Sequence, residues 1–341
     1  MGQIFKHIRT EYRSMMKYNI SHADFWEEFE EVWIAALKSQ RWYNSPNIVD
    51  YNPYSEREEL KDDFENDDHI YLIARDEDGV GVGVLEFKCY PNYAKNGVMM
   101  PGVKDSCKQF NIGDALLQFQ EFYLKNRNIE PIISSIKYTS REEVEWYFDT
   151  LTRNGFKMNE PEGFQMYVNL ESIESFEGTD QYRMLTRNNF APEDFVEFAI
   201  RSYASTPEDL QIHGWDKSVT EPDQIRAIHK YTIDGAFGKS PSEWWRVIEK
   251  DKNPLGYILG FELEPERKTR VGTIGNLGVF PEYRRQGLAV LLIHSLLREF
   301  QNDGIQYARV GTPTMNVRAI GAYKKAGFID GNRIQFFRKD I

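Results

Sequence analysis

Residues suited to binding a phosphate group follow an apolar, strand-like segment in the last third of the chain. They read V-F-P-E-Y-R-R-Q-G-L-A over Val279–Ala289, and an amphipathic helix is predicted directly after them, over Val290–Phe300. Such a turn directs successive backbone N–H groups and the positive end of the helix dipole at one point, which favours an anion. Gly287 allows close backbone approach, and Arg284 and Arg285 can neutralise the anion.

A second pattern follows at a fixed distance. A strand is predicted over Tyr307–Val310, Asn316 precedes a predicted helix over Val317–Lys325, and A-Y-K-K-A-G-F occupies Ala322–Phe328. The first pattern alone is also typical of a solvated helix cap. Two ordered patterns at this spacing are more specific than either one.

Together the patterns resemble those of the GNAT superfamily of acyl-CoA-dependent N-acetyltransferases. Arg284, Gly287 and Ala289 match its phosphate-loop pattern, Q/R-x-x-G-x-G/A. Its later pattern, N-x-x-A-x-x-x-Y-x-x-x-G-F, is matched by Asn316, Ala319, Tyr323, Gly327 and Phe328. The resemblance implies acetyl-CoA as co-substrate. It also implies a sheet whose fourth and fifth strands, here Val271–Val279 and Tyr307–Thr312, diverge into a V that holds the acyl-CoA.

The resemblance assigns cofactor-binding roles within the second half. The pyrophosphate is expected to contact two rim arginines and a run of backbone amides: Arg284, Arg285, Gln286, Gly287, Leu288, Ala289 and Val290. The pantetheine arm is expected to lie along a strand and beside a helix start: Leu277, Gly278, Val279, Asn316, Ala319 and Tyr323. The strand edge would also stabilise the oxyanion. Asn316 equally suits a helix N-cap, and both roles can hold together.

Tyr323 matches the general acid of the family. A phenol has a pKa of about 10 and a thiol one of about 8.5, so full proton transfer from tyrosine to a thiolate is uphill in water. A hydrogen bond that strengthens as the sulfur becomes anionic describes the role better. The alternative is a core tyrosine packed beside Phe328.

The two patterns say less about the residues that bind the acceptor amine. Many relatives carry a glutamate base on the fourth or fifth strand, where this chain has Asn276. Acceptor contacts in the family come from the loop that here contains His213 and Trp215, so these two and Asn276 are the candidate acceptor residues. His213 is a candidate base, with a structural or exposed histidine as the alternative. Carboxylates near the cleft, each also suited to a solvated surface, are Glu262, Glu264 and Glu282.

The chain also repeats itself. Offsets of 170, 176 and 172 separate Asp24 from Asp194, Gly113 from Ala289 and Phe156 from Phe328. Nearly constant offsets indicate duplication. We therefore expect two tandem GNAT-like domains, residues 1–172 and 178–341, each an α+β fold with a mixed sheet flanked by helices.

The first copy has lost the residues that carry chemistry in the second. Its loop is Lys108–Gly113, with Asn111 in place of the loop glycine and no arginine. Leu151 stands opposite Tyr323, and Val144 opposite Asn316. Residues 1–172 are expected to be a degenerate, non-catalytic domain, although backbone amides alone leave CoA binding there open.

Composition narrows the possible partners and cofactors of the protein. The 341 residues carry a net charge of −11, which argues against a nucleic-acid partner. Two cysteines and six scattered histidines show no metal-ligand spacing. No signal peptide or membrane span is apparent, so we expect a cytoplasmic monomer or homodimer without a membrane partner.

The predicted function is acetyl transfer from acetyl-CoA to a primary amine of a small molecule or peptide, by direct attack on the thioester. Two alternatives stay open. One is a non-catalytic acyl-CoA-binding or interaction protein, and the other is a transferase with a different acyl donor.

Overall fold

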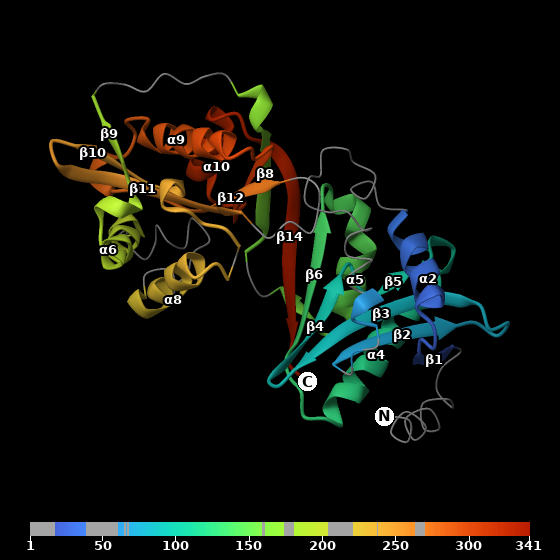
Figure 1. Ribbon diagram of the computed structural model, residues 1–341. Coiled ribbons are helices and arrows are strands. Elements are labelled where there is room, and N and C mark those ends of the chain that lie inside the picture. Colours follow the sequence, from blue (N-terminus) through green and yellow to red (C-terminus); the bar gives the residue numbers. More distant parts are fainter. Residues whose placement is uncertain are drawn as a thin grey trace. The chain divides into compact units, whose positions relative to one another are not determined.

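The computed structural model describes residues 18–38, 61–64, 66, 68–158, 161–173, 181–203, 221–236, 238–262 and 270–341. They belong to two compact units (Figure 1). The first unit comprises Met1–Glu162 and Asn332–Ile341, and the second comprises Gly163–Gly331. The last ten residues of the chain therefore belong to the first unit, and the second unit is one continuous segment.

The first unit contains a sheet with strand order β1-β2-β3-β4-β6-β14, in which β5 pairs with β3 and β7 with β14. Its strands are β1 (Asn19–His22), β2 (His69–Arg75), β3 (Gly81–Tyr90), β4 (Tyr93–Val98), β5 (Gly102–Val103), β6 (Ile132–Tyr138), β7 (Lys157–Met158) and the greater part of β14 (Ile329–Lys339). Its helical elements are α2 (Trp26–Lys38), η2 (Asp105–Phe110), α4 (Ile112–Lys125), η3 (Arg141–Val144) and α5 (Glu145–Arg153).

Helices cover both faces of this sheet. A Cβ added to Gly81 would meet Val32 of α2, whereas one added to Gly83 would meet Ile112 of α4. The end of the chain closes the core, because Phe337 of β14 is fully buried and packs edge-on against Phe148 at a centroid distance of 5.1 Å. Burial of one such ring stabilises the unit by about 2–3 kcal/mol.

The second unit has a sheet with strand order β8-β13-β12-β11-β10-β9. The strands are β8 (Gly163–Asn169), β9 (Arg183–Thr186), β10 (Trp245–Lys250), β11 (Asn253–Glu262), β12 (Val271–Val279) and β13 (Tyr307–Pro313). The helical elements are η4 (Leu170–Ser172), η5 (Arg187–Asn189), α6 (Pro192–Tyr203), α8 (Pro222–Ile233), η7 (Ser242–Trp244), η8 (Pro281–Tyr283), α9 (Leu288–Asn302) and α10 (Val317–Lys325).

Figure 1 shows α6 and α8 on one face of this sheet and α9 and α10 on the other. A Cβ on Gly278 would meet Ser202 of α6, and one on Gly272 would meet Phe300 of α9. Helix α9 buries Leu292, Leu296 and Phe300, which recur every four residues, and so presents one apolar stripe to the strands.

The two sheets repeat one strand order. Each has a single parallel pair among antiparallel neighbours, β4 with β6 in the first unit and β12 with β13 in the second. Each also ends on an antiparallel strand from elsewhere in the sequence, since residues 333–339 pair with β6 and β8 pairs with β13. A mixed sheet flanked by helices, as predicted, is confirmed for both units.

Across the described ranges, no helix combines the length and apolar character required to cross a bilayer.

A buried histidine lies between α8 and β10. His229 is 4% exposed, its ring lies 5.5 Å from that of Trp245, and both of its ring nitrogens are buried without a hydrogen-bond partner. Burial lowers the pKa of His229 to about 4, so the ring is neutral in the folded protein at neutral pH.

We predict that His229 makes the second unit sensitive to mild acid. Because the folded pKa lies below the unfolded value of about 6.5, stability is fully present above pH 6.5 and falls by up to about 3 kcal/mol as the pH drops toward 4. Thermal unfolding of the wild type and His229→Leu at pH 7.5 and pH 5 measures this effect. The wild-type midpoint should drop further than that of the variant, and equal drops would contradict the assignment.

Candidate functional site

The two parallel strands at the centre of the second unit separate part-way along their length. β12 and β13 pair from Val271 and Tyr307 as far as Ile274 and Val310. β12 nevertheless continues to Val279, and along this stretch it stays paired with β11 on its other edge. The diverging pair of strands expected from the sequence resemblance is therefore present.

A bulge marks the point of separation. Leu259 of β11 pairs with Asn276 and Gly260 pairs with Ile274, which leaves Gly275 as the extra residue of β12. A bulge bends its strand and re-aims the neighbouring side chains. Backbone groups of residues 275–279 on the β13 side lie beyond the last β12–β13 pair, so an extended ligand with amide groups can pair with them.

The loop after β12 has a conformation suited to an anion. Arg285 and Gly287 have φ values of 66° and 81°, with Gln286 between them. Left-handed residues in such a turn direct successive N–H groups to one side. The loop ends at the N-terminus of α9, where the amides of Leu288 and Ala289 have no carbonyl acceptor within the helix. A Cβ on Gly287 would meet nothing within 4 Å, so the space in front of the loop is open.

Some predicted ligands are engaged within the protein. The Arg284 guanidinium donates from Nε to the Val279 carbonyl at 3.1 Å and from Nη2 to the Ser202 carbonyl at 2.6 Å. The Val290 amide donates to the Gly287 carbonyl at 3.0 Å. Arg284 therefore joins the end of β12 to the last turn of α6, while Arg285 is the exposed arginine at the rim of the loop.

A second contact joins the same two elements. Arg201 of α6 forms an ion pair with Glu282 of η8, and its guanidinium lies 4.1 Å from the ring centroid of Phe280. A backbone hydrogen bond, together with Arg201, lowers the pKa of the Glu282 carboxyl. Glu282 is thus a poor proton acceptor.

The residues predicted along the pantetheine arm lie at the gap between the strands. Leu277 and Gly278 pair with β11, Gly278 is buried against α6, and the Val279 carbonyl accepts from Arg284. Asn316 is the N-cap of α10, since its Oδ1 accepts from the Ala319 amide at 3.3 Å and its Nδ2 donates to Thr312 at 3.1 Å.

Two further glycines of the second unit, one on β13 and one on α10, have room for a side chain. A Cβ added to Gly311 of β13 or to Gly321 of α10 would meet nothing within 4 Å. Like Gly287, each of these two glycines faces open space.

Tyr323 lies in the core of the unit. It is 5% exposed, and its ring lies 5.7 Å from that of Phe328, as the core-tyrosine alternative requires. Burial raises the pKa of Tyr323, and the neighbouring phenol of Tyr203 raises it further. Tyr323 is therefore a neutral O–H donor rather than a proton acceptor.

Tyr203 is a polar residue of the site that sequence reasoning missed. It ends α6, and its hydroxyl donates to Asn276 Oδ1 at 3.4 Å. Burial raises the pKa of Tyr203 to about 12, against a smaller opposing effect of the Asn276 hydrogen bond. The only signal in the sequence is a tyrosine at the end of an amphipathic helix, which is common and says nothing about its partner.

The other residues predicted to contact the acceptor amine either lie outside the described residues or are bound to other side chains. His213, Trp215 and Glu264 fall in the undescribed ranges. Glu262 is bound by Arg270, with an N–O distance of 2.6 Å. Among the described residues, no three histidine, cysteine, aspartate or glutamate side chains are grouped to hold a metal ion.

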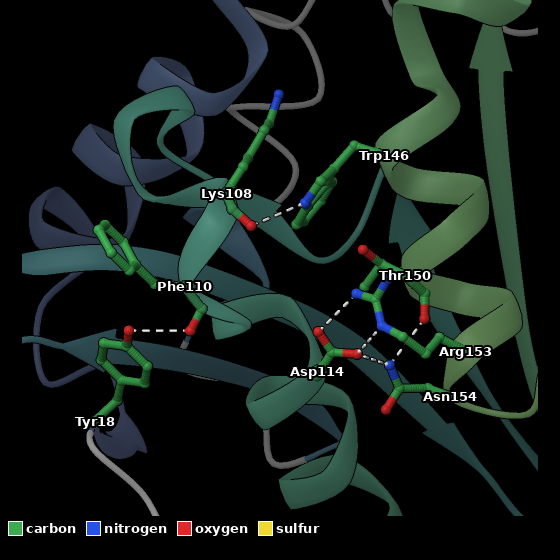
Figure 2. Close-up of polar contacts among 8 residues, drawn as sticks. All are labelled: Tyr18, Lys108, Phe110, Asp114, Trp146, Thr150, Arg153 and Asn154. Carbon is green, nitrogen blue, oxygen red and sulfur yellow. Dashed lines mark hydrogen bonds and ion pairs between the residues drawn. The ribbon is translucent and has the colours of Figure 1, made fainter.

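The corresponding loop of the first unit keeps one left-handed residue before its helix, and the Trp146 side chain lies against it (Figure 2). Asn111 adopts the same left-handed conformation as Gly287, with a φ of 56°. The Trp146 indole donates to the Lys108 carbonyl at 3.1 Å, and a Cβ on Gly113 would lie 2.9 Å from the indole ring.

Polar side chains further join the two helices at this end of the first unit. Arg153 and Asn154, at the end of α5, both donate to the Asp114 carboxylate in the first turn of α4, at 2.8 and 2.6 Å (Figure 2). The Tyr18 hydroxyl donates to the Phe110 carbonyl at 3.0 Å. The first turn of α4 thus carries a carboxylate that is bonded to the end of α5.

In the first unit, two methionines fill the place that follows the last pair of its parallel strands, Val98 with Ser135. The Met99 amide donates to the Ser135 carbonyl at 3.2 Å, and Met99 Sδ accepts from the Lys137 amide at 3.3 Å. Met99 and Met100 are each 1% exposed, so they fill this part of the unit. The next residue, Pro101, corresponds to Leu277 and has no N–H to donate.

Residues 208–328 match the model of the acetyltransferase (GNAT) family. No curated protein matches the chain in sequence. A solved GCN5-related N-acetyltransferase from Sphaerobacter thermophilus is 14% identical, with a TM-score of 0.58 over 95% of this chain and 96% of that one. The glucosamine N-acetyltransferase region of a fungal multi-domain GH3 β-N-acetylglucosaminidase is 10% identical, with a TM-score of 0.53 over 94% of this chain and 38% of that one.

A tandem GNAT protein from the clavulanic acid biosynthesis pathway is 12% identical over 94% of this chain and 98% of that one, with a TM-score of 0.49. The first two structures share the fold of this chain, and the family match covers the diverging strands, the loop and Tyr323. Residues 208–328 therefore match the acetyltransferase (GNAT) family, and the chain as a whole shares the fold of these solved N-acetyltransferase structures.

Proposed function

We propose that the second unit transfers an acetyl group from acetyl-CoA to a primary amine of a small molecule or peptide. The observation that carries this proposal is the gap between β12 and β13. A loop with left-handed residues, suited to an anion, follows β12, Tyr203 donates to Asn276 after the last β12–β13 pair, and Tyr203 interacts electrostatically with Tyr323.

The residues present suit an acyl-CoA. The left-handed loop and the first turn of α9 offer backbone N–H groups to a pyrophosphate, with Arg285 at the rim. The free edge of residues 275–279 suits an arm that contains amides. A Cβ on Gly311 or on Gly321 would meet nothing within 4 Å, so neither position obstructs such an arm.

Each group has a role in the reaction. Acetyl-CoA supplies a thioester: the amine nitrogen forms a bond to its carbonyl carbon, the carbon–sulfur bond breaks, and a proton lost by the amine is balanced by one gained by the sulfur. Backbone N–H groups at the free edge of β12 donate to the carbonyl oxygen as it becomes negative. Tyr323, kept neutral by burial, donates a hydrogen bond to the sulfur as it becomes anionic.

We further propose that the first unit is structural and holds no acyl-CoA. Trp146 covers its loop, Asp114 brings a negative charge to the start of α4, and Met99 and Met100 fill the place where a gap would open. A carboxylate at a helix N-terminus satisfies the dipole that a phosphate would otherwise use.

We predict that Gly287→Glu abolishes acetyl-CoA binding. A carboxylate in front of the loop repels the pyrophosphate, which should weaken affinity by at least about hundredfold. Gly304→Glu is the matched control, because Gly304 has a φ of 75° and lies at the far end of α9. Calorimetric titration should give one site per chain in the wild type and the control. Normal affinity in Gly287→Glu would contradict the site, and two sites per chain would contradict the role of the first unit.

Substitution of one arginine should affect acetyl-CoA binding, and substitution of the other should affect the stability of the second unit. Arg285→Ala removes an exposed charge and should weaken acetyl-CoA binding about three- to tenfold at low salt, with less effect at high salt. Arg284→Ala removes two hydrogen bonds from a charged group, about 2 kcal/mol, and should lower the melting temperature by about 5 °C. Titration and thermal unfolding of both variants test this. Weaker acetyl-CoA binding in Arg284→Ala, with a lower melting temperature in Arg285→Ala, would contradict this prediction and would make Arg284 the phosphate ligand.

Tyr323→Phe should lower kcat about hundredfold, because the sulfur loses its hydrogen-bond donor, while acetyl-CoA affinity stays within about twofold. Release of free CoA thiol in the presence of a panel of amines measures the rate. Tyr307→Phe, at the paired end of β13, serves as the control. A wild type that binds acetyl-CoA but acetylates no amine would instead support a non-catalytic acyl-CoA-binding protein.

A further inference from the structure

Tyr203 and Asn276 form a pair at the point where the strands separate. Asn276 follows the bulged residue Gly275, and the last β12–β13 pair is at Ile274. The Tyr203 hydroxyl approaches from α6 and donates to Asn276 Oδ1 at 3.4 Å. The pair thus lies beside the site proposed for the thioester.

The pair leaves the amide oxygen able to accept a second hydrogen bond. A side-chain amide oxygen has two lone pairs, and the Tyr203 hydroxyl uses one of them. Tyr203 also interacts with Tyr323, whose hydroxyl is the proposed donor to the sulfur. The second lone pair of Asn276 is therefore available close to the groups proposed to act on the thioester.

The position of Tyr203 is set by contacts with the phosphate loop. The preceding residue, Ser202, accepts a hydrogen bond from Arg284 at 2.6 Å through its carbonyl, and Arg201 is paired with Glu282. Ser202 also donates to the Ala199 carbonyl at 2.8 Å, which completes the last turn of α6. The helix end that carries Tyr203 is held to the loop on two sides.

We propose that Asn276 orients the acceptor amine and that Tyr203 is the positioning residue that holds Asn276. The Asn276 amide oxygen accepts a hydrogen bond from the amine N–H and so directs the nitrogen lone pair at the thioester carbonyl. Tyr203 fixes the orientation of the amide, and Arg284 and Arg201 fix Tyr203. This inference rests on the proposed acetyltransferase function.

Kinetics of Tyr203→Phe, Asn276→Ala and the double variant test the pair, with the amine that gives the highest wild-type rate. Each single variant should lower kcat/KM for the amine about tenfold to hundredfold, because an unoriented nucleophile reacts more slowly. Acetyl-CoA affinity should stay within about twofold. The kcat/KM of the double variant should be at most about threefold below that of the less active single variant, since the two residues act as one unit.

Tyr231→Phe is the control, because Tyr231 is exposed on α8. Should Tyr203→Phe fail to fold, Asn276→Ser carries the same comparison, with thermal unfolding to establish that it is folded. Unchanged amine kinetics in Tyr203→Phe, effects that multiply in the double variant, or an equal loss of acetyl-CoA affinity would each overturn the proposal. A wild type with no turnover for any amine would overturn the proposed function itself, and that result needs no variant to be seen.

Discussion

The end of hydrogen bonding between β12 and β13, just after Ile274 and Val310, is the constraint on which the candidate site depends. Backbone N–H and C=O groups near a protein interior require partners, so a parallel pair that stops half-way leaves a row of groups for a ligand. The bulge at Gly275 bends β12 at the same point and brings Asn276 to the mouth of the gap. The sites proposed for the cofactor and for the acceptor therefore both lie at one break in one sheet.

The last turn of α6 contacts both the loop after β12 and Asn276. Arg284 belongs to the phosphate-loop pattern, yet its guanidinium contacts the carbonyls of Val279 and Ser202. This arginine therefore stabilises the contact between the loop and the helix that carries Tyr203. The first unit shows the alternative outcome of the same fold, since Met99 and Met100 are buried after its last parallel pair and the Trp146 indole bonds to its loop. The same strand order thus leaves this place open in the second unit and filled by side chains in the first.

Much of the fold and of the loop could be predicted from the sequence, because their signals are local. The glycine at position 287 and Asn316 as an N-cap follow from residue type and position, and the diverging strands were expected from the family resemblance. The direction of the Arg284 side chain could not be predicted, because a long cation suits a phosphate and a carbonyl equally well. The exchanged segments, residues 163–169 and 333–339, were also unforeseen, because an apolar strand pairs with any free edge of suitable register.

The sequence by itself determined which backbone conformations are allowed and which segments are strands or helices, since glycine, proline, caps and apolar periodicity act over a few residues. It also determined that two copies exist and that only the second keeps Arg284, Gly287, Asn316 and Tyr323 together. Only the tertiary structure decided that Tyr203 meets Asn276 and that Met99 closes the first copy. Those contacts join residues far apart in the chain, and packing rather than local preference selects them.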